Sequence, residues 1–288
     1  MIENEVKNKN KHALIVEGGA MRGIFAAGVL DAFLDFNFNP FDFCIGVSAG
    51  STNIAAWLAG QRDRNYKVIT DYSCRPQFIV PLKFLFGGHL LDLDWLWEIT
   101  IREIGIDVEA MEKSGIPLYI VTTRVDTGKA EYYTATADNL ETLMKSSCAI
   151  PVFYRGFPPF NEISMTDGGV ADSIPVKKAY EMGAREITVI LSQPDGYRKK
   201  EKKIPWFIRK DILSYPELIN AMDNRGKNYN ESLDFINNPP SDCIINTIIP
   251  DDTFKVGRTT KNKKLLDEGY AMGLQAGELF VKNKLNSK

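Results

Sequence analysis

The sequence predicts an α/β fold with a mainly parallel central sheet that is covered by helices on both faces. Short apolar runs such as 13–16 have the length and composition of parallel strands buried on both faces. Segments with helical periodicity alternate with these runs, which is typical of a parallel sheet covered by helices. A Gly-x-Ser-x-Gly motif at 46–50 stands between the second apolar run and a helical run, the context of a nucleophile elbow.

The first elements follow from their apolar patterns. We expect a strand over 13–16, a turn over 17–23 and then a helix over 24–34, whose apolar residues cover so much of its circumference that it should be well buried. A second strand over 41–45 runs into the serine motif, and a helix follows over 54–59. This β-turn-α-β-turn-α opening has about the length of a βαβ unit.

Later elements continue the alternation. Further strands are predicted over 118–123, 129–134, 186–191 and 243–248, and helices near 139–145, 171–183, 216–236 and 263–281. Pro216 suits the first turn of its helix, where its missing N–H costs nothing. The segment 76–98 is dense in large apolar groups, and it forms either a substrate groove or lid, or part of the core.

Length and composition indicate one domain. The chain has 288 residues, without an internal repeat, a low-complexity tract or a convincing linker. We expect a polar tail over 1–12 and a single α/β domain over 13–288. Its motifs fall within 13–194, and 195–288 forms a C-terminal extension of helices and a strand.

Charge and cysteine usage exclude several classes of protein. A net charge of −2 argues against a nucleic-acid binder, which is normally basic. The four cysteines form no Cys-x-x-Cys pair, so neither a zinc site nor a disulfide framework is indicated. Residues 1–12 lack the apolar stretch of a secretory signal, and no window has the roughly 18 apolar residues of a membrane helix. We therefore expect a cytoplasmic protein.

Ser48 is the candidate nucleophile, and the flanking Gly46 and Gly50 permit the sharp turn that exposes it. An α/β-hydrolase triad needs a histidine late in the chain, but the two histidines are His12 and His89. Ser48 is therefore either activated by another group or is not a nucleophile.

The turn Gly18-Gly19-Ala20 is the candidate oxyanion hole. It follows the first strand and opens a helix, so its N–H groups and the helix dipole favour negative charge there. In a parallel sheet this turn and Ser48 lie at the same edge. A plain strand–helix connection is the alternative interpretation.

Asp167 is the candidate base, because a strand or hairpin over 160–166 ends in Asp167-Gly168-Gly169. A turn aspartate that binds its own backbone is the alternative. An aspartate with a pKa of about 4 is a weak base for an alcohol, but desolvation and a hydrogen bond to Ser48 would make the pair competent.

Three motifs in this order and spacing, 18–23, 46–50 and 167–169, resemble the patatin-like phospholipase family, in its bacterial branch. The serine-rich stretch 146–151 adds to the resemblance, which covers about 13–194; beyond it, 196–199 and 256–258 look like features of that branch. The resemblance implies a three-layer α/β/α fold and a Ser48–Asp167 dyad, with residues 18–20 as the oxyanion hole. It also implies motif or substrate-binding roles for Arg22, Gly23, Gly46, Gly50, Gly168 and Gly169.

The implied function is a serine acyl hydrolase of phospholipase A or lysophospholipase type, acting on lipid carboxylic esters through an acyl-enzyme. The resemblance implies no cofactor and no metal. The expected partner is a lipid or acyl-ester substrate, with peripheral contact at the inner membrane surface, and no binding of nucleic acid is expected. No oligomeric state is indicated. The alternatives are a carboxylesterase or thioesterase acting on soluble substrates, and a non-catalytic lipid-binding regulatory module.

Ala20 departs from the family pattern, which has a third glycine there. If the position needs a positive φ, alanine carries strain on the order of 1 kcal/mol. Ala20 also counts against a dinucleotide-binding Gly-x-Gly-x-x-Gly motif, and a P-loop is excluded because Gly-Lys-Ser/Thr is absent.

Two basic features have alternative interpretations. Arg22 either contacts a substrate phosphate or carboxylate, or forms a structural ion pair. The basic run 198–203 and the aromatic residues after it suit an anionic lipid surface, and equally a solvated loop before a packed helix.

Overall fold

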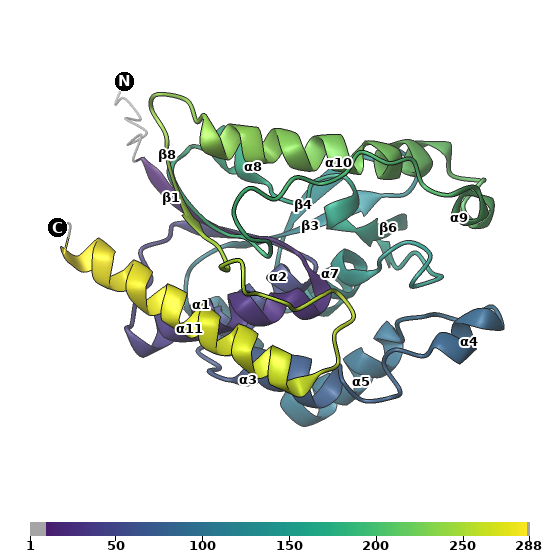
Figure 1. Ribbon diagram of the computed structural model, residues 1–288, viewed down its shortest axis with the longest axis horizontal. Coiled ribbons are helices and arrows are strands. Elements are labelled where there is room, and N and C mark those ends of the chain that lie inside the picture. Colours follow the sequence, from purple (N-terminus) through teal and green to yellow (C-terminus); the bar gives the residue numbers. More distant parts are fainter. Residues whose placement is uncertain (1–9, 287–288) are drawn as a thin grey trace, which may run out of the picture.

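A computed structural model of the protein describes residues 10–286, in which one mixed sheet of eight strands lies between two layers of helices (Figure 1). Residues 1–9 of the predicted tail lie outside the described residues, and the first strand begins at Lys11, inside that predicted tail. The strands are β1 (Lys11–Val16), β2 (Phe43–Val47), β3 (Leu118–Arg124), β4 (Ala130–Thr134), β5 (Pro159–Phe160), β6 (Ile163–Asp167), β7 (Ala184–Ile190) and β8 (Ile244–Ile248).

The sheet has the order β5-β6-β3-β2-β1-β7-β8, with β4 paired to β3. The strands β3, β2, β1, β7 and β8 run parallel, whereas β4 and β6 pair with β3 in the antiparallel sense. The predicted mainly parallel sheet is therefore confirmed for its centre, and its antiparallel strands gather at one side. Every residue of β2 is buried, as its apolar sequence requires.

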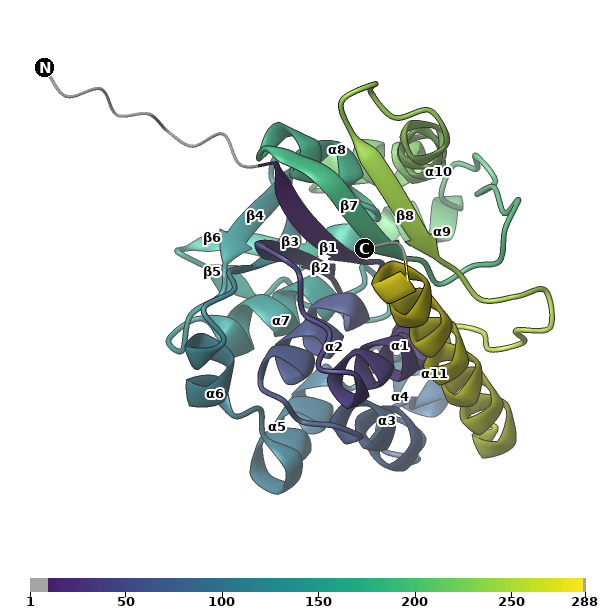
Figure 2. The same cartoon turned by 90° about the vertical axis from the view of Figure 1, so that its left-hand side faces the viewer.

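Helices cover both faces of the sheet, so the predicted three-layer arrangement is confirmed (Figures 1 and 2). The layer with α8 and α10 packs on one apolar cluster, and the layer with α1, α2 and α7 packs on another. The helices are α1 (Gly23–Asp35), α2 (Ala49–Leu58), α3 (Arg64–Lys67), α4 (Pro81–Leu85), α5 (Leu93–Ile104), α6 (Val108–Lys113), α7 (Leu140–Cys148), α8 (Val176–Glu181), α9 (Trp206–Asp211), α10 (Pro216–Asn237) and α11 (Lys263–Asn286).

Two predicted segments differ from the structure. The helix expected over 171–183 begins only at Val176, because Pro175 stands before it and residues 168–170 form a separate 3-10 turn. The segment 76–98 contains α4 and the start of α5, neither of which was predicted. Asp92 starts α5 by accepting a hydrogen bond from the amide of Trp95 over 3.1 Å.

The last helix, α11, packs closely along α1 (Figure 2). A Cβ on Gly273 would lie 2.1 Å from the carbonyl oxygen of Phe25, and a Cβ on Gly28 would lie 2.3 Å from that of Tyr270. Only glycine permits this approach of the two backbones. No helix within 10–286 is both long and apolar enough to cross a membrane.

Candidate active site

Ser48 lies in a strained turn between β2 and α2. Its φ of 52° and ψ of −127° place a non-glycine residue at positive φ, which persists only where the surroundings enforce it. The flanking glycines are needed for close packing. A Cβ on Gly50 would lie 2.3 Å from the carbonyl oxygen of Val16, and one on Gly46 would lie 2.4 Å from the Cα of Ser51.

The register of β3 brings Ser48 and Asp167 together. On one edge of β3, β2 ends with Val47 opposite Val121, and β6 ends with Asp167 opposite Thr122. The other edge is taken by β4, so β2 and β6 must share the first edge and meet end to end. Ser48 follows Val47 directly, and its hydroxyl is close enough to the Asp167 carboxylate to influence the pKa of that group.

Asp167 is 4% exposed, and burial raises the pKa of its carboxyl group. The positive charge of Arg225 opposes that rise, as do the amide of Gly169, the charge of Arg258 and the hydroxyl of Ser48. The Gly169 amide donates to Oδ1 over 2.6 Å and so holds the carboxylate in place. A carboxylate with a raised pKa is a better proton acceptor for a serine hydroxyl than an ordinary aspartate.

The turn Gly18-Gly19-Ala20 lies against the Ser48 elbow. A Cβ on Gly18 would lie 2.8 Å from the Cβ of Ser48, so this position needs glycine for contact. Ala20 has a φ of 50°, the left-handed conformation in which alanine is strained. All three turn residues line one small cavity together with Ser48 and Asp167.

Arg22 lies in a buried polar network beside this turn. Its Nε and Nη2 donate to Ser192 Oγ over 3.2 and 3.0 Å, and Nη2 is 3.9 Å from Glu17 Oε1. These contacts favour the structural interpretation of Arg22. The next residue, Gly23, is also held by a structural contact, because its carbonyl accepts a hydrogen bond from Asn53 Nδ2 on α2 over 2.8 Å.

The two glycines after Asp167 have different surroundings. Gly168 packs so tightly on β3 that a Cβ there would lie 2.1 Å from the carbonyl oxygen of Val121. Gly169 offers its carbonyl to Ser173 Oγ at 2.7 Å and to Arg225 Nε at 2.6 Å.

Two cavities meet at Ser48. The larger has a volume of about 330 Å³, and much of its wall is apolar. It is lined in part by the segment 76–98, through Phe78, Leu91, Leu93, Leu96 and Trp97. The smaller has about 20 Å³, and Ala20, Ser48 and Ile150 line both.

Sequence reasoning missed several residues at this site. Ser147 accepts a hydrogen bond from the Ser48 amide over 2.8 Å, and it lies in the serine-rich stretch whose resemblance was noted. Lys199 and Arg258 line the small cavity and belong to the two segments attributed to a bacterial branch. Arg225 also lines it, but nothing in the sequence distinguishes it from the other polar residues of α10.

The two histidines make contacts away from Ser48. His12 Nε2 is 2.9 Å from Thr188 Oγ1, and the ring of His89 stacks on Tyr154 with centroids 4.3 Å apart. Within the described chain, no group of three or more His, Cys, Asp or Glu side chains is arranged to hold a metal ion.

Comparison with known proteins gives two family matches. The model of the patatin-like phospholipase family matches residues 14–180, and that of a domain of unknown function (DUF6363) matches residues 215–286. The uncharacterized protein YjjU of Escherichia coli K12 is 34% identical over 276 residues, which cover 93% of this chain and 76% of that protein.

Two further proteins are similar. The probable lipid hydrolase 463L of Invertebrate iridescent virus 6 is 24% identical over 221 residues, covering 70% of each chain. Among solved structures, VipD from Legionella pneumophila aligns over 93% of this chain and 67% of its own, with a TM-score of 0.41 and 14% identity.

Proposed function

This chain belongs to the patatin-like phospholipase family, and we propose that it is a serine acyl hydrolase that cleaves carboxylic esters of lipids. One observation carries the proposal: Ser48 lies beside the buried carboxylate of Asp167, at the junction of a large cavity and a small one. The viral relative named a probable lipid hydrolase supports the same class of reaction.

In the proposed reaction, Ser48 Oγ attacks the ester carbonyl carbon and its proton passes to Asp167. The N–H groups of residues 18–20 stabilise the oxyanion of the tetrahedral intermediate. When this intermediate collapses, Asp167 returns the proton to the departing alkoxide, and the acyl group stays on Ser48. Water then attacks the acyl-enzyme and gives a proton to Asp167. Asp167 passes this proton to Ser48 Oγ as the fatty acid leaves, which restores the free enzyme.

The large cavity favours long acyl chains over short ones. Each methylene group moved from water into an apolar wall contributes about 0.8 kcal/mol of binding. A cavity of about 330 Å³ that opens at Ser48 supports a lipid substrate over a short soluble ester. Esters with short, medium and long chains test this, because a rate that falls as the chain grows would favour the soluble carboxylesterase.

Contact with a lipid surface is part of the proposal. Phe86 beside α4, Leu82 on α4 and Trp206 on α9 are 85%, 66% and 77% exposed. The two helices lie toward the same side of the molecule, away from the C-terminal end of α11 (Figure 1). Such exposed apolar groups insert into the boundary between lipid headgroups and chains.

Sedimentation with anionic lipid vesicles tests this contact. We expect Phe86→Ser and Trp206→Ser to reduce the fraction bound. Leu279→Ser is the control, because Leu279 is 60% exposed but lies on α11. Equal binding by all three variants would contradict a contact through α4 and α9.

The central experiment combines covalent labelling with hydrolysis. A fluorophosphonate should form one adduct, on Ser48, and Ser48→Ala should lose both the adduct and at least about a thousandfold of the hydrolysis rate. Asp167→Asn should lose them as well, whereas Asp126→Asn, a change at an exposed carboxylate, should not. Hydrolysis by folded Ser48→Ala protein at the wild-type rate would refute the mechanism, and no adduct on folded wild type would favour a lipid-binding module.

A further inference from the structure

We propose that Lys199, Arg225 and Arg258 form an anion subsite beside Ser48, which binds phosphate oxygens of the substrate next to the ester that is cleaved. The inference rests on the proposed function, because it takes Ser48 as the nucleophile. It assigns substrate selection to the part of the chain beyond the patatin-like match, since all three residues follow residue 180.

The three cations reach one cavity from three separate segments. Lys199 lies in the loop after β7, Arg225 on α10, and Arg258 in the loop between β8 and α11. All three line the small cavity that also contains Ser48 and Asp167. Their convergence is therefore a product of the fold rather than of a basic run in the sequence.

Specific contacts hold the side chains of Arg225 and Lys199 and the backbone of Arg258. Arg225 Nε donates to the carbonyl of Gly169 over 2.6 Å, and Lys199 Nζ lies 3.8 Å from the centroid of the Tyr229 ring. The carbonyl of Arg258 accepts a hydrogen bond from the Met21 amide over 3.4 Å, which ties its loop to the glycine-rich turn. None of these contacts involves a carboxylate.

Basic side chains outnumber acidic ones in the lining of the cavity. There are three of them, Lys199, Arg225 and Arg258, against the two carboxyl groups of Glu17 and Asp167. Glu17 already accepts a hydrogen bond from the Ser192 amide over 2.7 Å and pairs with Arg22. Within residues 10–286, none of Lys199, Arg225 and Arg258 forms an ion pair with a carboxylate.

Burial and the nearness of like charges lower the proton affinity of Lys199 and Arg225. Burial, together with repulsion from Arg225 and Arg258, lowers the pKa of Lys199 to about 6, so that a bound anion would draw a proton onto this lysine. Burial and the charge of Arg258 likewise lower the pKa of Arg225. An anion in the cavity would relieve this repulsion, because buried charges are stable only when they are paired.

The size and position of the cavity indicate which part of a substrate it takes. About 20 Å³ is room for one or two oxygen atoms, not for a whole headgroup. Because Ala20, Ser48 and Ile150 line both cavities, an ester held at Ser48 has its acyl chain in the large cavity and its other side at the cations. Phospholipids and lysophospholipids carry a phosphate on that side, and neutral acylglycerols do not.

Binding of small phosphates tests the subsite without catalysis. In calorimetric titrations of Ser48→Ala protein, inorganic phosphate and glycerol 3-phosphate should both bind, the second more tightly. Adding Lys199→Gln or Arg258→Gln should weaken binding about tenfold, the loss expected for one charged hydrogen bond. Lys202→Gln, at an exposed lysine of the same loop, is the control and should not change it.

Hydrolysis of a matched pair of substrates tests selectivity. Wild type should prefer lysophosphatidic acid to the monoacylglycerol with the same acyl chain, and Arg258→Gln should reduce the kcat/KM ratio about tenfold. An equal fall for both substrates would assign the cations to the oxyanion and overturn the subsite, as would the absence of phosphate binding. Tighter binding of inorganic phosphate than of glycerol 3-phosphate would overturn the headgroup assignment.

The two proposals fail in different ways. Phosphate binding that depends on Lys199 and Arg258, in a protein that hydrolyses neither lipid, would refute the proposed function and leave the anion site standing. Hydrolysis that depends on Ser48, without phosphate binding or a charge preference, would refute the subsite alone. Arg225 is left intact in these tests because it also binds Gly169.

Discussion

The backbone amide of Ser48 donates a hydrogen bond to the hydroxyl of Ser147 over 2.8 Å, and that hydroxyl donates to the carbonyl of Val121 over 2.6 Å. One buried side chain at the end of α7 therefore ties the strained turn after β2 to strand β3. Ser147 is fully buried, so water cannot replace its hydroxyl as the partner of the Ser48 amide and the Val121 carbonyl.

Ser147→Ala should lower activity through position rather than chemistry. The Ser48 amide would lose its partner, at a cost of about 1–3 kcal/mol, and the turn would be free to relax. We expect kcat to fall on the order of a hundredfold with little change in KM. Ser146→Ala is the matched control, because the Ser146 hydroxyl donates to the carbonyl of Thr142 one turn earlier in the same helix. Equal kinetics for the two variants would contradict a positioning role.

The pH profile should reveal the buried base. Burial raises the pKa of Asp167 above the ordinary value of about 4, and only the ionised carboxylate accepts a proton. The acid limb of kcat/KM, and of the fluorophosphonate labelling rate, should therefore lie above that value, with activity rising as pH increases. A profile that stays flat down to about pH 4 would show that no such carboxylate controls the reaction.

Ala20→Gly should relieve strain in the glycine-rich turn. Alanine at a φ of 50° is strained by about 1–2 kcal/mol, which glycine would relieve. Glycine in turn destabilises the folded state by about 0.5–1 kcal/mol, because its unfolded chain has more conformational entropy to lose. The net gain in the free energy of unfolding is about 0.5–1 kcal/mol, measurable by urea unfolding. Labelling of Ser48 should be faster if the strain displaces an oxyanion donor, and a slower rate would show that the turn is already well placed.

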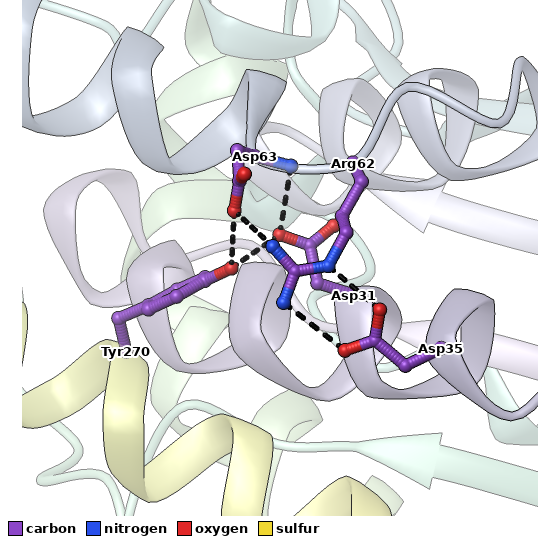
Figure 3. Close-up of polar contacts among 5 residues, drawn as sticks. All are labelled: Asp31, Asp35, Arg62, Asp63 and Tyr270. Carbon is purple, nitrogen blue, oxygen red and sulfur yellow. Dashed lines mark hydrogen bonds and ion pairs between the residues drawn. The ribbon is translucent and has the colours of Figure 1, made fainter.

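Asp31 should make stability depend on pH. The Tyr270 hydroxyl on α11 donates to Asp31 Oδ2 on α1 over 2.6 Å and lies 3.0 Å from Asp63, beside the Arg62–Asp35 pair (Figure 3). Burial raises the pKa of Asp31 to about 6. The folded state therefore binds this proton at a higher pH than the unfolded chain, so stability is gained as pH falls from about 6 to about 4 and lost as it rises.

Asp31→Asn tests that sign. Relative to wild type, the variant should become more stable as pH rises from about 5 to about 7, by roughly 1–3 kcal/mol, because a buried amide carries no charge. Asp35→Asn is the control at an exposed ion pair, which contributes at most about 1 kcal/mol. Parallel stability curves for wild type and Asp31→Asn would contradict the assignment.

Local sequence was sufficient for most of the sheet and for the elbow. Apolar runs of strand length identified β1, β2 and β3, because a strand buried on both faces needs apolar side chains throughout. Glycines at 46 and 50 located the Ser48 turn, since no other residue permits those contacts. The helix over 171–183 was wrong at its start because Pro175 stands inside the pattern. The helix α5 was missed although its buried residues Leu93, Leu96, Ile99 and Thr100 recur at helical spacing, and the short helix α4 was missed as well.

The tertiary structure decided which residues meet. Nothing in the sequence distinguished Asp167 from other turn aspartates until the resemblance named it, because its place beside Ser48 depends on two strands ending on one edge of β3. The gathering of Lys199, Arg225 and Arg258 depends on three distant segments. The single domain over 13–288 stays a prediction that the contact of α11 with α1 supports. The sequence by itself thus determined the elements and the Ser48 turn, which depend on neighbouring residues. The place of Asp167 beside Ser48, the gathering of the three basic side chains and the cavities depend on contacts between distant residues, which only the tertiary structure provides.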